Sequence, residues 1–147
     1  MLYAFRHARE DLARYTAPLT TAQIWARPHG FGSVGFHIRH IGGSVERLLA
    51  YLDARTLSRE QLVAINHEHD PGARREELLA ELDKSLHEAE TIVRHIDFAT
   101  LAEPRYVGRK RLPTTVMGLL VHIAEHTQRH IGQAVISAKW AAVETEQ

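Results

Sequence analysis

The sequence has 147 residues, of which 44% are hydrophobic, a composition that excludes disorder as the main state and suits one domain spanning residues 1–147. Basic and acidic residues number 18 each, so the net charge is zero and we expect no nucleic-acid or anionic membrane partner. No window approaches the roughly 20 apolar residues of a membrane helix, and the N-terminus lacks a signal peptide's apolar stretch. The absence of cysteine excludes disulfides and a thiolate nucleophile and predicts a cytoplasmic protein.

The N-terminal part predicts one helix over residues 4–15 and then a short helical turn. Four residues share one apolar face of the predicted helix, namely Phe5, Ala8, Leu12 and Tyr15. Pro18 ends this helix. Thr20 and Gln23 have the spacing of a capping box, which predicts a turn that reaches Trp25.

Two further helices and a long crossover are predicted in the middle of the chain. Ser33 is the predicted N-cap of a helix that extends to about residue 54. The stretch 55–72 is longer than an ordinary turn and holds another pair with capping-box spacing, Ser58 and Gln61. Asp70 followed by Pro71 predicts the start of the next helix, because proline is favoured at the first helical position. We expect that helix to extend to about Ile96.

The C-terminal part predicts a fourth helix that begins at residues 113–115 and continues to about residue 142. The basic stretch before it, residues 105–112, could form a small hairpin. Four amphipathic helices with one long connection predict an all-α four-helix bundle with a crossover between its second and third helices. The tail, residues 144–147, is expected to be solvated.

The unusual count is 11 histidines, the side chain that most commonly binds metals. His122, His126 and His130 follow one another at intervals of four residues. Neighbours in this series lie on one face of a helix about 6 Å apart, so two of their imidazoles can reach one ion. The first and last are about 12 Å apart along the axis, too far for a shared ion.

The apolar stripe of this helix selects the pair. Its members are Val116, Leu119, Leu120, Ile123, Thr127, Ile131, Ala134 and Ala138. His130 lies at the margin of the stripe and His126 just beyond it, whereas His122 is rotated a further 40° or so away. A third ligand should come from the second helix, which offers His37 and His40. Periodicity alone favours His37.

The residues around these histidines resemble the DinB-like, or YfiT-like, family of metal-binding bundles. Residues 126–133, HTQRHIGQ, look like the family's His-xxx-His-x-Gly-Gln signature, and residues 33–44, SVGFHIRHIGGS, resemble its second helix. The resemblance covers nearly the whole chain. In that family the ligand immediately precedes an apolar-small-small-Ser/Asp run, which implies His40. The implied site is therefore His40, His126 and His130, with His37 as the alternative to His40.

Six other histidines are expected to be exposed or to cap helices: His7, His29, His67, His69, His87 and His95. The run 67–70, HEHD, has a metal-like composition but is predicted to lie in a loop without a partner motif. We therefore expect no metal site there. The arginines of residues 105–111 are interpreted as a solvated connection, with binding of an anionic substrate as the alternative.

Three neutral imidazoles leave coordination positions open, as in catalytic rather than structural zinc sites. Zinc and nickel are the leading candidates, with iron(II) as a third. The resemblance implies an S-transferase that uses an external low-molecular-weight thiol, such as bacillithiol or mycothiol. The alternatives are a metal-dependent hydrolase and a non-catalytic stress-response or ligand-binding bundle.

No catalytic residue is identified from the sequence. Glu46 and Glu125 are considered as bases or as partners that orient the ligands. The resemblance also implies a homodimer that acts on a small-molecule substrate.

Overall fold

The computed structural model describes residues 1–143, so the predicted tail at 144–147 lies outside the described residues. Its elements in chain order are α1 (Leu2–Thr16), α2 (Thr21–Trp25), α3 (Val34–Leu52), α4 (Arg59–His67), α5 (Arg75–Arg94), β1 (Pro104–Val107), β2 (Leu112–Thr115) and α6 (Val116–Val143). Two short 3-10 helices, Pro28–Gly30 and Phe98–Thr100, lie in the connections. The prediction of an all-α fold is confirmed.

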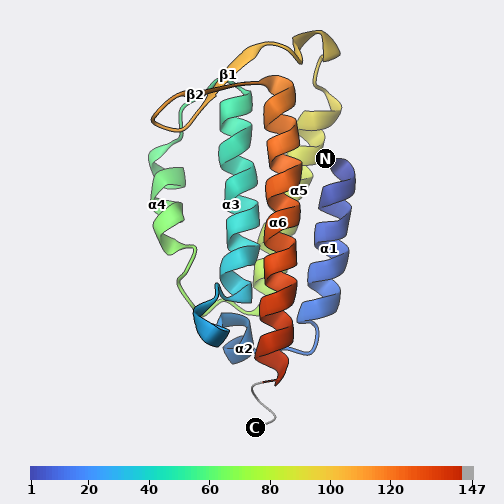
Figure 1. Ribbon diagram of the computed structural model, residues 1–147, viewed down its shortest axis with the longest axis vertical. Coiled ribbons are helices and arrows are strands. Elements are labelled where there is room, and N and C mark those ends of the chain that lie inside the picture. Colours follow the sequence, from blue (N-terminus) through green and yellow to red (C-terminus); the bar gives the residue numbers. More distant parts are fainter. Residues whose placement is uncertain (144–147) are drawn as a thin grey trace.

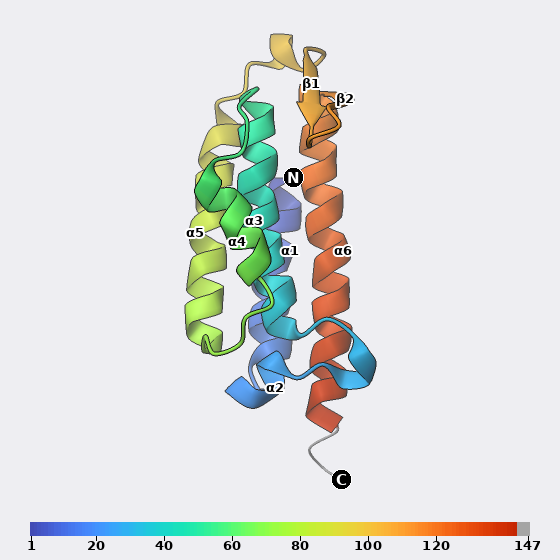
Figure 2. The same ribbon diagram turned by 90° about the vertical axis from the view of Figure 1, so that its left-hand side faces the viewer.

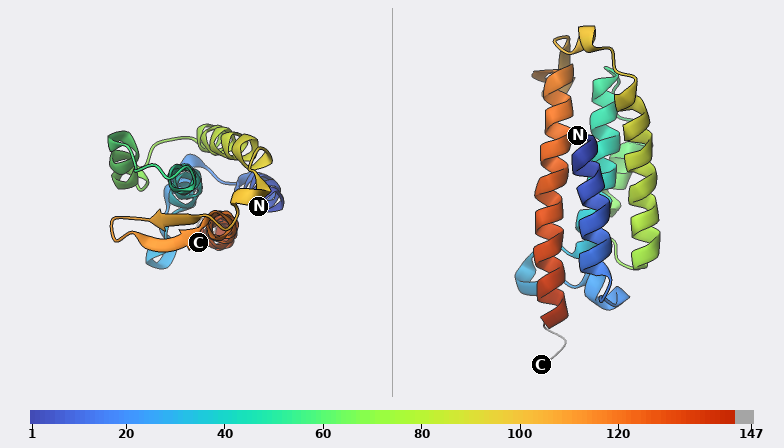
Figure 3. Two further views of the ribbon diagram at one scale, coloured as in Figure 1. Left: turned by 90° about the horizontal axis from the view of Figure 1, so that it is seen from above. Right: turned by 90° about the vertical axis from the view of Figure 1, so that its right-hand side faces the viewer.

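The four long helices α1, α3, α5 and α6 lie side by side (Figure 1). Helix α3 packs against α5 and α6, and α1 packs against the same two helices. Seen from above, the four surround a common core, and α4 lies outside them (Figure 3). The fully buried side chains include Phe5, Leu12, Ile38, Ile41, Leu78, Leu86, Leu119 and Ile123. Each such side chain contributes about 1.5–3 kcal/mol on burial, so the bundle has an apolar core independent of any metal.

Two predicted helix caps fix the entry into α3. Thr20 and Gln23 form the full capping box at the start of α2. At the start of α3 the Ser33 hydroxyl accepts a hydrogen bond from the Phe36 backbone N–H at 3.1 Å. A cap of this kind is worth about 1 kcal/mol, and here it sets where the first turn of α3 begins.

The predicted start of the third long helix is wrong. Helix α5 begins at Arg75, four residues beyond Pro71. Gly72 has a φ of +121°, which is incompatible with a helix, so Pro71 cannot be its first residue. Asp70 accepts instead from the ring Nδ1 of His67 at 2.6 Å.

The predicted hairpin is present, but it displaces the predicted start of the fourth helix. Residues 113–115 belong to β2, which pairs antiparallel with β1 at one end of the bundle (Figure 1). Helix α6 therefore begins at Val116. The Thr115 hydroxyl accepts from the Gly118 N–H at 3.1 Å, so this threonine acts as a cap rather than as a helical residue.

The crossover between α3 and α5 contains α4, which lies against the outer face of α3 (Figure 2). No residue of α4 is buried, and Leu62, Val63 and Ile65 are exposed. The core therefore contributes little to holding α4. Among the described residues, no helix is long and apolar enough to cross a membrane.

Candidate metal centre

Helices α3 and α6 bring His40, His126 and His130 together. One ring nitrogen of each lies within 4.8 Å of those of the other two, and all three residues are half-buried. The Nε2 atoms of His40 and His126 are 3.0 Å apart. The ring centroids of His130 lie 4.3 Å from His40 and 4.5 Å from His126. Within residues 1–143 this is the single group of three or more histidine or acidic side chains with such geometry.

The arrangement of these nitrogens fits a divalent transition metal. Two ligands on a tetrahedral ion with bonds of about 2.05 Å are separated by about 3.3 Å, close to the separation of the His40 and His126 nitrogens. Imidazole nitrogens suit zinc, nickel and iron alike. No fourth side chain joins the group in the described part of the chain, so the donor set matches an open site.

The surroundings of His126 and His130 favour the neutral form of these two rings. Burial, together with the charge that His40 can carry nearby, lowers the pKa of His126 to about 4 and that of His130 to about 3. Near neutral pH both rings are therefore unprotonated. A metal ion would not have to displace protons from them, because neutral imidazole is the ligand form.

His37, the residue that periodicity favoured, lies next to His130. Its Nδ1 is 3.1 Å from the Nδ1 of His130, and it does not belong to the group of three. It is buried, and burial lowers its pKa to about 4. Gly32 leaves room for this ring, since a Cβ there would lie 2.8 Å from the His37 Nε2. The geometry makes His37 a hydrogen-bond partner of His130.

The run 67–70, predicted to lie in a loop without a partner motif, contacts α3 through Glu68. Glu68 follows α4 and reaches the centre, where its Oε2 lies 2.7 Å from the Nδ1 of His40. His69 stacks on Phe36 with parallel rings 3.9 Å apart. The composition of the run was the available signal, but helical periodicity could not place a loop residue beside His40.

Glu68 is ionised in this setting. Burial tends to raise its pKa, but the hydrogen bond with His40 and the charge of Arg47 lower it overall. The two acidic residues considered from the sequence make other contacts. Glu46 accepts from the Ser85 hydroxyl at 2.7 Å, and Glu125 pairs with Arg129 on α6.

A groove of about 380 Å³ adjoins the centre on the side of His37. It is lined by Phe31, Gly32, His37, Arg129, Gly132, Gln133, Ile136 and Ser137. Its apolar members Phe31 and Ile136 are exposed to solvent, and Arg129, which pairs with Glu125, is its cationic side chain.

The hairpin arginines are not part of this groove. Arg105 donates to the Leu52 carbonyl at 2.6 Å, at the opposite end of α3 from His40. Twelve residues of helix separate those two positions by about 18 Å. An anionic group bound near the centre would therefore meet Arg129 rather than Arg105.

Fold and site together define a helical bundle with a three-histidine candidate metal centre. A sequence profile of the DinB superfamily matches residues 4–134, and the chain belongs to that superfamily. A crystal structure described as a conserved protein from Enterococcus faecalis has the same fold, with a TM-score of 0.77 over 96% of this chain and 94% of that one. The two sequences are 18% identical, so this likeness concerns the fold alone. None of the curated proteins matches the sequence.

Proposed function

We propose that this protein is a metal-dependent enzyme in which His40, His126 and His130 hold one divalent ion, zinc or nickel first and iron(II) as a third candidate. The observation that carries the proposal is the convergence of three half-buried imidazoles without a fourth protein ligand among residues 1–143. A metal that only fastened helices would be expected to have a closed set of four ligands. When bound, such an ion supplies Lewis acidity and lowers the pKa of a thiol or water that reaches its open positions.

The reaction that we favour is transfer of an external low-molecular-weight thiol to an electrophilic substrate. The thiol sulfur forms a bond to the electrophilic carbon, the leaving group departs with its electron pair, and the thiol proton is released. The chain has no cysteine, so the sulfur must come from outside. The groove beside His37 supports this reaction, because Phe31 and Ile136 can cover an apolar substrate while Arg129 faces an anionic group.

Two assays test the proposal on protein loaded with zinc or nickel. Elemental analysis of untagged wild type should give one ion per chain, and His126→Ala should give none. His122→Ala is the matched control, since His122 is exposed on the same helix and lies outside the group of three.

The loaded protein is then given N-acetylcysteine with chlorodinitrobenzene, and separately nitrophenyl acetate. Thiol transfer that His126→Ala loses and His122→Ala keeps supports the transferase. Ester hydrolysis with the same dependence, in place of thiol transfer, would instead identify a hydrolase. If the protein binds one ion per chain but catalyses neither reaction, the proposed transfer to this electrophile is contradicted. If the wild type binds no ion, the metal centre itself is contradicted.

We also propose that the protein is a homodimer. An apolar groove of about 500 Å³ lies where α1, α5 and α6 meet, and Met117 and Val121 on α6 are exposed beside it. Covering such a face with a second copy would bury this apolar surface. Light scattering on wild type and Val121→Lys should show a dimer and a monomer, respectively.

A further inference from the structure

Glu68 is buried to an extent that is unusual for a carboxylate. Its side chain is 8% exposed, although it belongs to the crossover segment rather than to a long helix of the bundle. Ionised carboxylates are rarely buried unless they are paired, because loss of hydration costs several kcal/mol per ion. The contacts that compensate for this burial therefore indicate what Glu68 does.

Both oxygens of Glu68 face groups of α3. The Nδ1 of His40 lies 2.7 Å from Oε2, and the Nη1 of Arg47 lies 2.8 Å from Oε1. Arg47 is itself 12% exposed, so the ion pair is largely shielded from water. Gly43 leaves the space for it, since a Cβ there would lie 2.9 Å from Oε1 and 2.8 Å from the arginine Nη1.

This arrangement determines which nitrogen His40 offers. A carboxylate only accepts hydrogen bonds, so the ring must carry its proton on Nδ1 and donate it to Glu68. In a neutral ring Nε2 then keeps its lone pair, and Nε2 is the atom that lies 3.0 Å from His126. We infer that Glu68 is a positioning residue of the metal centre, which fixes the tautomer and orientation of His40 and thereby raises the affinity for the ion. The inference rests on the proposed function of the three histidines.

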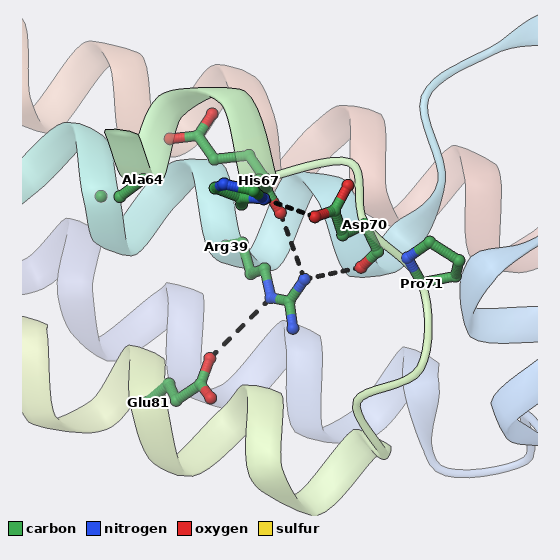
Figure 4. A pocket seen from close by; sticks show the side chains of 8 residues that line it. Arg39, Ala64, His67, Asp70, Pro71 and Glu81 are labelled. Atoms are coloured by element: carbon green, nitrogen blue, oxygen red, sulfur yellow. Dashed lines mark hydrogen bonds and ion pairs between the residues drawn. The ribbon is translucent and has the colours of Figure 1, made fainter. Parts of the chain in front are cut away.

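The backbone around Glu68 is also held by α3. The guanidinium of Arg39 donates to the carbonyl of Asp70 at 2.6 Å and to that of His67 at 3.3 Å (Figure 4). It lies 4.0 Å from Glu81 of α5 as well. A cavity of about 430 Å³ lies between this segment and the bundle, so polar contacts rather than close packing hold it in place. One turn of α3 therefore holds the backbone on either side of Glu68 through Arg39, and it also carries the candidate ligand His40.

Zinc affinity, measured by competition with a chelating dye, tests the inference. Glu68→Gln keeps the side-chain volume but has a single oxygen, for which His40 and Arg47 compete. We expect the affinity for zinc to fall by about 10- to 100-fold, the usual effect of removing an outer partner of a ligand. Gly43→Ala should give a smaller loss, because it displaces the ion pair but leaves the carboxylate of Glu68 in place. Glu46→Gln is the matched control, since Glu46 lies on α3 and bonds Ser85 rather than a histidine.

A second measurement needs no metal. Nitrogen NMR of the imidazole rings in zinc-free protein should show His40 protonated at Nδ1 in wild type and a shift toward Nε2 protonation in Glu68→Gln. Equal zinc affinities in wild type and Glu68→Gln, with an unchanged His40 tautomer, would overturn the role of Glu68 while leaving the three-histidine centre intact. Failure of wild type to bind zinc, nickel or iron(II) would instead overturn the proposed function.

Discussion

Helix α6 and the crossover segment reach the same centre by different physical means. On α6 the candidate metal ligands His126 and His130 are one helical turn apart beside an apolar stripe. Local helix geometry therefore places both side chains on the same face. Glu68 lies 28 residues from its partner His40. It follows α4, a helix that has no buried residue and so no apolar face that would position the segment. The difference teaches that the two candidate ligands on α6 can be read from periodicity, whereas the choice of His40 and the group that orients it depend on how α3 and the crossover pack.

The largest expected effect distinguishes His40 from His37. His40→Ala should reduce zinc affinity by more than about 100-fold, beyond the loss of an outer partner, because its Nε2 belongs to the group of three. His37→Ala should reduce it by about 10-fold, because His37 contacts His130 without joining the group. Titration of both variants with zinc decides the matter. A reversed order would make His37 the ligand.

Metal removal should lower stability without unfolding the bundle. At a free zinc concentration 100 times the dissociation constant, binding adds about 2.7 kcal/mol to the free energy of unfolding. The apolar core, which includes Ile41 and Ile123, does not involve the ion. Circular dichroism after chelation should therefore show retained helicity and a lower melting temperature. Complete loss of helicity would show that the metal is structural and that the bundle does not fold without it.

Acidification should destabilise the metal-free protein. In the folded state the pKa values of His37, His126 and His130 are lowered to about 4, 4 and 3, whereas the ordinary value is 6.5. Between these values the unfolded chain binds more protons, so the free energy of unfolding falls as pH decreases from about 6.5 toward 3. Urea unfolding between pH 7 and pH 4 measures this slope. His126→Asn should flatten it, and His87→Asn, at an exposed position on α5, is the control.

The smallest expected effects concern the start of α5. Pro71→Ala should change the free energy of unfolding by no more than about 0.5 kcal/mol, because Pro71 is not the first helical residue. Gly72→Ala should cost about 1 kcal/mol, since its φ of +121° strains any other residue. Urea denaturation of the two variants compares them. A larger loss of unfolding free energy for Pro71→Ala would support Pro71 as the first helical residue, as the sequence predicted.

By itself the sequence determined the helical fold, the capping boxes at Thr20 and Ser58, and the face of α6 that carries His126 and His130. These features depend on interactions within a few residues, which spacing reveals directly. It also predicted a hairpin, although it could not show that residues 113–115 pair with β1 instead of starting α6.

Only the tertiary structure decided how α3 packs against α6 and where the crossover meets α3. His37 and His40 are three residues apart. The packing of α3 against α6 placed the Nε2 of His40 beside His126, and it placed His37 in contact with His130 outside the group of three. Glu68 became part of the centre because Arg39 and Arg47 hold its segment against α3. Such contacts join residues far apart in the chain, and no local periodicity encodes them.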